Sequence, residues 1–117
     1  MRHRKTGKIL DRKQGPRKAL LRGLVNSLVL YEKIKTTKAK AKAIKPIVEK
    51  YVTIGKTPSL HHKRLLKSEL YTEGAIRKVF EVLGPRFKDR KGGYTRIINL
   101  GPRQGDGAEI VQIEFVS

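Results

Sequence analysis

Hydrophobic residues recur every three or four positions along most of this chain, and they alternate with polar residues in a few short segments. The first spacing places side chains on one face of a helix, and the second places them on one face of a strand. The first helical segment begins where Pro16, a residue favoured at a first helical position, follows Gly15. The pattern predicts a helix whose apolar face consists of Leu20, Leu21, Leu24, Val25 and Leu28.

A short alternating segment and a second helical segment follow. Residues 31–36 alternate, with Ile34 between two lysines, and this pattern is compatible with a strand. A helix then begins with Thr36 or Thr37 as its N-cap, because a threonine hydroxyl can accept a hydrogen bond from the first turn. Pro46 falls inside this helical pattern and cannot donate a backbone hydrogen bond, so the helix either kinks there or begins later. The predicted apolar contacts of this helix are Ile44, Ile47, Val48, Tyr51 and Val52.

Two further helices are predicted in the middle of the chain. Gly55 ends the second helix, and residues 60–70 form a modest third one with Leu65, Leu66 and Leu70 as its apolar contacts. Thr72 can cap a fourth helix, whose apolar residues follow helical spacing. Gly84 and Pro85 are expected to stop it, since glycine often ends helices and proline cannot continue one.

The last quarter of the chain predicts a β-hairpin. Residues 94–100 and 109–116 are strand-like, and the second run alternates strictly, which indicates one buried face. Residues 101–107 between them are rich in turn-forming glycine, proline and aspartate. Helices packed on one face of a small, mostly antiparallel sheet give an α+β fold.

Basic residues are far more frequent than acidic ones, and they concentrate at the start of the chain. The net charge is +18, from 28 lysines and arginines against 10 aspartates and glutamates. Residues 1–22 hold nine basic residues and a single acid. Because so few apolar residues accompany them, residues 1–15 are predicted to form a flexible basic arm, and residues 16–117 a single core domain. This charge favours a polyanionic partner.

Several classes of function are disfavoured by what the sequence lacks. Cysteine is absent, which excludes disulfides and thiolate metal sites, and no apolar run is long enough for a membrane span. His61 and His62 are adjacent, so they would diverge on a helix, and His3 lies in the arm. No serine stands in a recognisable catalytic motif. We therefore expect no enzyme activity, no cofactor, no metal, no small-molecule substrate and a cytoplasmic location.

Three basic surfaces are candidates for binding nucleic acid: the arm with the start of the first helix, a lysine-rich face at the second helix, and residues 86–96. The lysine face is explained equally well as a solvated surface. In residues 86–96, the rings of Phe87 and Tyr94 either offer a stacking surface for an unpaired base or belong to the core. The predicted contacts are Arg2, His3, Arg4, Lys5, Lys8, Arg12, Lys13, Arg17, Lys18, Arg22, Lys35, Lys38, Lys40, Lys42, Arg86, Arg90, Lys91, Tyr94 and Arg96.

Several separated segments together resemble the bacterial large-subunit ribosomal protein seventeen family over essentially the whole chain. The most specific are Met1-Arg2-His3-Arg4-Lys5 and Gly92-Gly93-Tyr94-Thr95-Arg96, and the others include Ile34-Lys35-Thr36-Thr37, Gly84-Pro85-Arg86-Phe87 and Ile113-Glu114-Phe115-Val116.

The resemblance implies a three-stranded sheet, with residues 31–37 as its first strand. It also implies a structural protein that binds large-subunit ribosomal RNA near the outer side of the peptide exit tunnel, beside other large-subunit proteins. Two other functions fit the sequence less well. A DNA-binding regulator would need a helix-turn-helix, and residues 55–59 match its turn poorly. An RNA-modifying enzyme or nuclease would need a catalytic cluster, and the sequence shows none.

Overall fold

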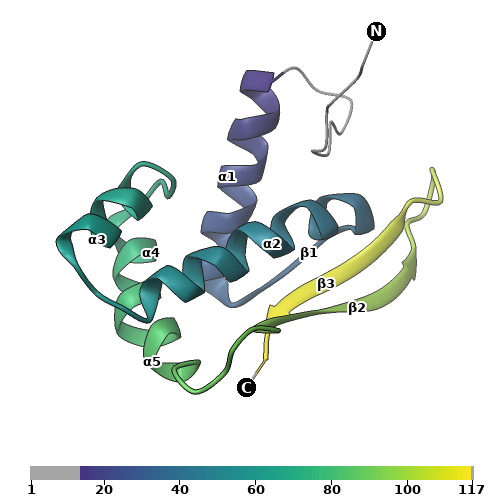
Figure 1. Cartoon of the computed structure of the whole chain (residues 1–117). Coiled ribbons are helices and arrows are strands. Elements are labelled where there is room, and N and C mark those ends of the chain that lie inside the picture. Colours follow the sequence, from purple (N-terminus) through teal and green to yellow (C-terminus); the bar gives the residue numbers. More distant parts are fainter. Residues whose placement is uncertain (1–13, 117) are drawn as a thin grey trace, which may run out of the picture.

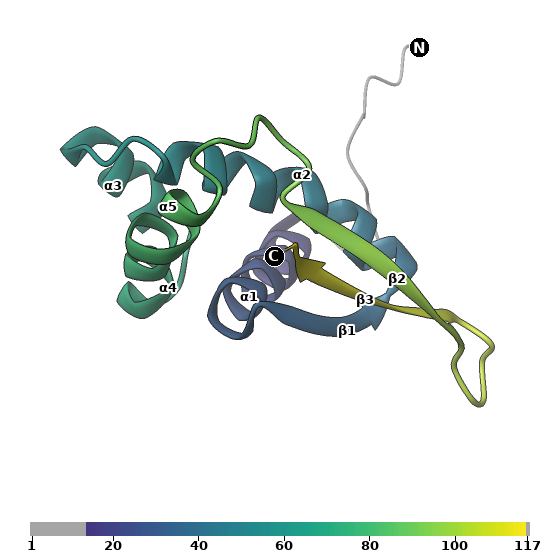
Figure 2. The same cartoon turned by 90° about the horizontal axis from the view of Figure 1, so that it is seen from below.

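Helices α1 (Gln14–Tyr31) and α2 (Lys38–Gly55) pack against a three-stranded sheet in the computed structural model, which describes residues 14–116 (Figure 1). The strands are β1 (Lys33–Thr37), β2 (Thr95–Pro102) and β3 (Glu109–Phe115). Both neighbouring pairs are antiparallel and the order is β1-β3-β2, so the last strand of the chain lies in the middle (Figure 2). The predicted α+β class is confirmed, and the sheet is entirely antiparallel.

The core lies between this sheet and the helices. Leu28, Ile44, Val48 and Ile113 are fully buried there, and the side chains of β3 alternate between buried and partly exposed positions as predicted. The apolar stripe of α1 buries its second half more completely than its first, because Val25, Leu28 and Val29 are buried while Leu21 and Leu24 are partly exposed.

Helix α2 runs from Lys38 to Gly55 with Pro46 inside it, so the alternative in which the helix begins later is wrong. Pro46 is exposed. The carbonyl of Lys42, which loses its hydrogen-bond partner at Pro46, lies one turn away on this exposed side, where it can turn to water. Thr37 occupies the N-cap position as predicted, but its side chain accepts no hydrogen bond from the first turn.

Helix α3 (Leu60–Lys67) is shorter than predicted, and Leu65, one of its three predicted apolar contacts, is not buried. Ser59 caps it, since its hydroxyl accepts a hydrogen bond from the His62 N–H at 3.1 Å. Leu66 is buried against the rest of the core, but the side chain of Leu65 is 42% exposed. The three predicted apolar contacts are therefore not equivalent.

The fourth helix does not stop at Gly84 and Pro85, contrary to the prediction. Helix α4 (Glu73–Lys78), which Thr72 caps as predicted, continues through a π-helical turn η1 (Val79–Leu83) into a final turn α5 (Gly84–Arg86). In η1 the N–H of Gly84 bonds to the carbonyl of Val79, five residues earlier. This wider turn gives the ring of Pro85 the room that a regular α-turn would deny it.

Gly55 and Gly84 meet where α2 crosses the end of this helix. A Cβ atom placed on Gly84 would lie 2.7 Å from the carbonyl carbon of Gly55, and one placed on Gly55 would lie 2.8 Å from the carbonyl oxygen of Val79. Neither distance leaves room for a methyl group, so the two helices approach closely only because both residues are glycine.

The predicted hairpin is confirmed, although β2 begins one residue later and ends two residues later than expected. Its turn is closed by the Gly107 N–H, which bonds to the carbonyl of Arg103 at 3.0 Å. The register between the strands shifts between Asn99 and Gly101, where Gly101 has a φ of 103°. This backbone conformation favours glycine and marks a β-bulge.

Candidate nucleic-acid interface

The first turns of both long helices are basic and contain no acidic residue. Arg17 and Lys18 lie near the start of α1, and Lys38, Lys40 and Lys42 lie near the start of α2. A helix N-terminus carries a partial positive charge, so cations there are unfavourable unless an anion compensates them. Lys18, Lys38 and Lys42 are exposed. Both helix ends are therefore suited to hold phosphate groups.

Lys35 and Lys38 lie at the junction between β1 and α2. Lys38 forms an ion pair of 3.3 Å with Glu109 of the neighbouring strand, and about half of each side chain is exposed. Such a surface ion pair contributes little to stability, so a phosphate can replace Glu109 at small cost. Lys35 is exposed on the sheet, directly opposite Gln112 of β3.

Arg22, a predicted contact, holds α3 against α1. Its Nε donates to the carbonyl of Glu69 at 3.2 Å and its Nη2 donates to the carbonyl of Ser68 at 2.9 Å, just beyond the last turn of α3. The guanidinium also lies 4.9 Å from the ring centre of Tyr71, at a distance typical of cation–π contacts. Two of the five N–H donors of Arg22 and one face of its guanidinium are therefore engaged inside the protein.

Arg86 is likewise engaged within the fold. It forms an ion pair with Glu32, which joins α1 to β1 with a φ of 65°, and Lys78 lies 3.1 Å from the same carboxylate. Lys78 also donates to the carbonyl of Leu30 at 2.9 Å, near the end of α1. This cluster ties the α1–β1 connection to the helix that contains α4, η1 and α5.

Replacing Glu32 by glutamine should destabilise the protein at neutral pH but not in strong acid. The hydrogen bond from Arg86 lowers the pKa of Glu32 to about 2, with Lys78 assisting and burial opposing. A carboxylate with a lowered pKa stabilises the folded state above its unfolded pKa, and this contribution is lost as pH falls toward 2. Because the group is partly exposed, we expect a loss of about 0.5–1 kcal/mol at pH 7.

Urea unfolding of both proteins from pH 7 to pH 2 measures this effect. The difference in unfolding free energy between the wild-type protein and Glu32→Gln should shrink between pH 5 and pH 2. A difference that does not change with pH would show that the carboxylate charge is not responsible. Asp106, whose pKa is also lowered to about 2 by Arg103, is present in both proteins and cancels in the comparison.

The remaining cations of residues 86–96 differ in their surroundings. Arg90 Nε donates to the carbonyl of Gly92 at 3.3 Å, which shapes the loop, and Arg96 Nε lies 3.4 Å from a carboxylate oxygen of Glu114. Lys91 is exposed, and no ion pair or hydrogen bond of its side chain occurs among residues 14–116. Among these three, Lys91 presents its charge most directly to solvent.

Tyr94 was included among the predicted RNA contacts, and the structure corrects this, because its ring is not available for stacking on a base. Its side chain is 2% exposed, and its ring centre lies 5.2 Å from that of Phe87. Its hydroxyl lies 3.3 Å from the Thr53 hydroxyl of α2, and Lys56 Nζ lies 4.7 Å from the ring centre. The ring belongs to the core, which is the other interpretation that the sequence left open.

The predicted contacts in the arm lie outside the described residues. Their role, and the division of the chain into an arm and a core domain, stay predictions, while α1 begins at Gln14, two residues before the predicted start. The predicted contacts concerned are Arg2, His3, Arg4, Lys5, Lys8, Arg12 and Lys13.

Sequence reasoning missed three surface residues. Lys33 is exposed on β1, and its alternation with Lys35 around Ile34 could have indicated this. Lys50 is exposed on α2, and Tyr31, at the end of α1, is 71% exposed. Tyr31 continues the helical spacing of the apolar stripe, and this pattern does not indicate that its ring faces solvent.

Among the residues that the structure describes, no three metal-binding side chains cluster. No helix in the described part of the chain is long and apolar enough to span a membrane.

Comparison with known proteins adds an independent observation. Residues 20–116 match the profile of a family described as ribosomal protein L17. The chain is 50% identical to the large ribosomal subunit protein bL17 of Thermomicrobium roseum over the full length of both chains. It is 49% identical to the protein of the same name from Exiguobacterium, in an alignment that covers 92% of this chain and 96% of the relative. It is 45% identical to that of Caldanaerobacter subterraneus, over 99% of this chain and 100% of the relative.

Proposed function

Because the chain belongs to the ribosomal protein L17 family, we propose that it is a structural constituent of the large ribosomal subunit that binds and stabilises large-subunit ribosomal RNA. Proteins of this family are structural ribosomal proteins and not enzymes. The observation that carries RNA binding is the pair of basic helix N-termini, which lack acidic residues in their first turns. Together with a net charge of +18, they favour phosphate over solvent as a neighbour.

The finer parts of the proposal concern location and neighbours. We place the protein in cytoplasmic ribosomes, at the outer side of the large subunit near the peptide exit tunnel, as its resemblance to the family suggests. No basic residue follows Arg103, and three acids do, so other basic ribosomal proteins are suitable neighbours for the C-terminal hairpin. Recognition would rest on the shape of folded RNA and on its phosphates rather than on a base sequence.

Salt dependence tests the electrostatic part of this proposal. If roughly six to ten phosphates are contacted, the affinity for large-subunit ribosomal RNA should fall about a thousandfold or more between 50 and 200 mM salt. Filter binding of the full-length protein to RNA transcribed in vitro measures this slope. A slope near zero would refute the account, and preference for duplex DNA in competition would favour the DNA-binding alternative.

A matched pair of triple variants locates the contacts. Changing Lys35, Lys40 and Lys42 to glutamine should weaken binding and reduce the magnitude of the salt slope by about 2, since each lost phosphate contact removes about 0.7–0.9. The control removes the same charge from α3, as Lys63→Gln, Arg64→Gln and Lys67→Gln. Lys35 lies in β1 and Lys40 and Lys42 lie near the start of α2, whereas α3 lies beside the other end of α2 (Figure 1). Equal losses of RNA affinity in both triple variants would mean that the net charge of the protein, and not the position of these lysines, determines binding.

A further inference from the structure

A groove of about 350 Å³ lies between α1, α2 and α3, away from the start of α2. Its walls are largely apolar, and the side chain of Leu65 at its edge is 42% exposed, although it belongs to the type of residue that normally joins a core. Leu65 is therefore part of a concave apolar surface rather than of the core. The apolar residues that line it are Leu21, Val25, Ile47, Ile54, Leu65 and Leu66.

The rim of this groove is basic. Lys18 of α1 and Lys50 of α2 line it, both are exposed, and neither has an ion pair among residues 14–116. Arg22 adds a third positive charge, although its donors are directed at the carbonyls that follow α3. Glu69 is the acid on this rim, and it accepts a hydrogen bond of 3.3 Å from the Tyr51 hydroxyl.

An apolar groove with a cationic rim matches the chemistry of an unpaired nucleotide. An unstacked nucleobase can pack its flat faces against apolar side chains, and its phosphates need cations at the edge of the site. Resting on the RNA-binding function proposed above, we infer that this groove receives an unstacked nucleotide of the ribosomal RNA, with the base over Leu65 and the phosphates beside Lys18 and Lys50. In this proposal the groove, and not the buried ring of Tyr94, contacts a base.

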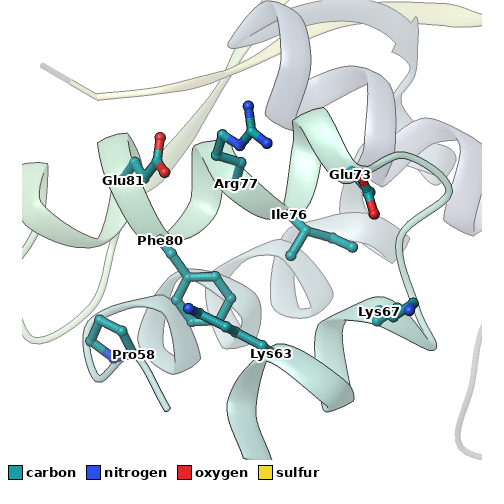
Figure 3. Close-up of a pocket in the computed structure, with 8 residues that line it drawn as sticks. All are labelled: Pro58, Lys63, Lys67, Glu73, Ile76, Arg77, Phe80 and Glu81. Atoms are coloured by element: carbon teal, nitrogen blue, oxygen red, sulfur yellow. The ribbon is translucent and has the colours of Figure 1, made fainter. Parts of the chain in front are cut away.

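A second groove on the protein is similar in size but differs from the first in the charge of its rim. It has a volume of about 430 Å³ and lies between α3 and the α4–η1 helix, with Ile76 and Phe80 among its apolar residues (Figure 3). Two acids, Glu73 and Glu81, line this groove together with three basic residues, so most of the positive charge on its rim is compensated. The first groove has three basic side chains and only Glu69 as an acid, so its excess of positive charge is larger, and the second groove is the weaker candidate for binding phosphate.

A single tryptophan can report on the first groove, because the chain contains none. In the full-length variant Leu65→Trp, fluorescence should be quenched when large-subunit ribosomal RNA binds, since a base stacks on the indole. The control is Leu60→Trp, on the same helix but outside the groove, where the replaced side chain is 65% exposed. Quenching in the first variant but not in the second is the expected result.

Charge variants give a second measurement that does not depend on an added ring. The double variant Lys18→Gln, Lys50→Gln should bind the same RNA about tenfold or more weakly than Lys63→Gln, Lys67→Gln at 100 mM salt, and its salt slope should be shallower. If the wild-type protein binds RNA but neither measurement separates the groove from its control, the inference fails and the proposed function stands. If the wild-type protein does not bind this RNA, the proposed function fails first.

One remaining outcome would identify a different occupant. A change in the fluorescence of Leu65→Trp that occurs in assembled large subunits, but not with RNA alone, would show that a neighbouring protein fills the groove. That result would overturn the inferred nucleotide.

Discussion

Replacing Gly84 by alanine should lower the free energy of unfolding by about 3 kcal/mol, which is a large effect for the addition of one methyl group. The φ of Gly84 is −56°, which any residue can adopt, so the position requires glycine for its small size alone. The new Cβ would meet the backbone of Gly55, and a backbone cannot move aside as a flexible side chain can. Urea unfolding followed by circular dichroism measures the loss, and Gly55→Ala should behave in the same way.

Gly23→Ala provides the matched control for this prediction. Gly23 lies inside α1, and the nearest atom to an added Cβ is in the ring of Tyr71, at 3.8 Å. This substitution should stabilise the protein by about 0.5–1 kcal/mol, because alanine loses less conformational freedom in a helix than glycine does. If Gly84→Ala were as well tolerated as Gly23→Ala, the close crossing of the two helices would be wrong.

Tyr94→Ala should cost about 3–5 kcal/mol of stability, because it removes a buried aromatic ring from between Phe87 and α2. A side chain used for base stacking on the surface would give a small change in stability instead. Thermal and urea unfolding of the purified variant distinguish these two results.

RNA binding by Tyr94→Leu completes the test, because leucine keeps much of the apolar volume and removes the ring. The affinity of the folded variant for ribosomal RNA should stay within about twofold of wild type, whereas loss of a stacked base would cost about 1–3 kcal/mol. Phe87→Leu is the control, since Phe87 is equally buried in the same cluster. A loss of affinity in Tyr94→Leu that Phe87→Leu does not share would return Tyr94 to the RNA-binding surface.

The parts of the fold that could be predicted from the sequence are those in which a local pattern decides the structure. The alternation of residues 109–116 identified β3 and its buried face, and the turn residues before it identified the hairpin. Thr72 was recognised as a cap because the hydroxyl and the N–H that it binds are only three residues apart. In each case the interacting groups are close neighbours in the chain.

The errors arose where distant segments meet. Gly84 and Pro85 looked like a helix end, but the π turn before them lets the helix continue against Gly55, which lies 29 residues earlier. Arg22 looked like a free cation, and its partners in the α3 region are 46 and 47 residues away. Charge identified the basic surfaces, but only tertiary structure separates the cations held by internal partners from those directed toward solvent.

The order of the strands has a consequence for when this protein can fold during its own synthesis. The central strand β3 is the last to be translated, and both β1 and β2 pair with it and not with each other. Until residues 109–115 have emerged from the ribosome, β1 has no partner in the sheet, even though it was made more than 70 residues earlier. Formation of the sheet is therefore a late event that waits for β3, and a chain that has not reached residue 109 leaves β1 and β2 without their partner strand.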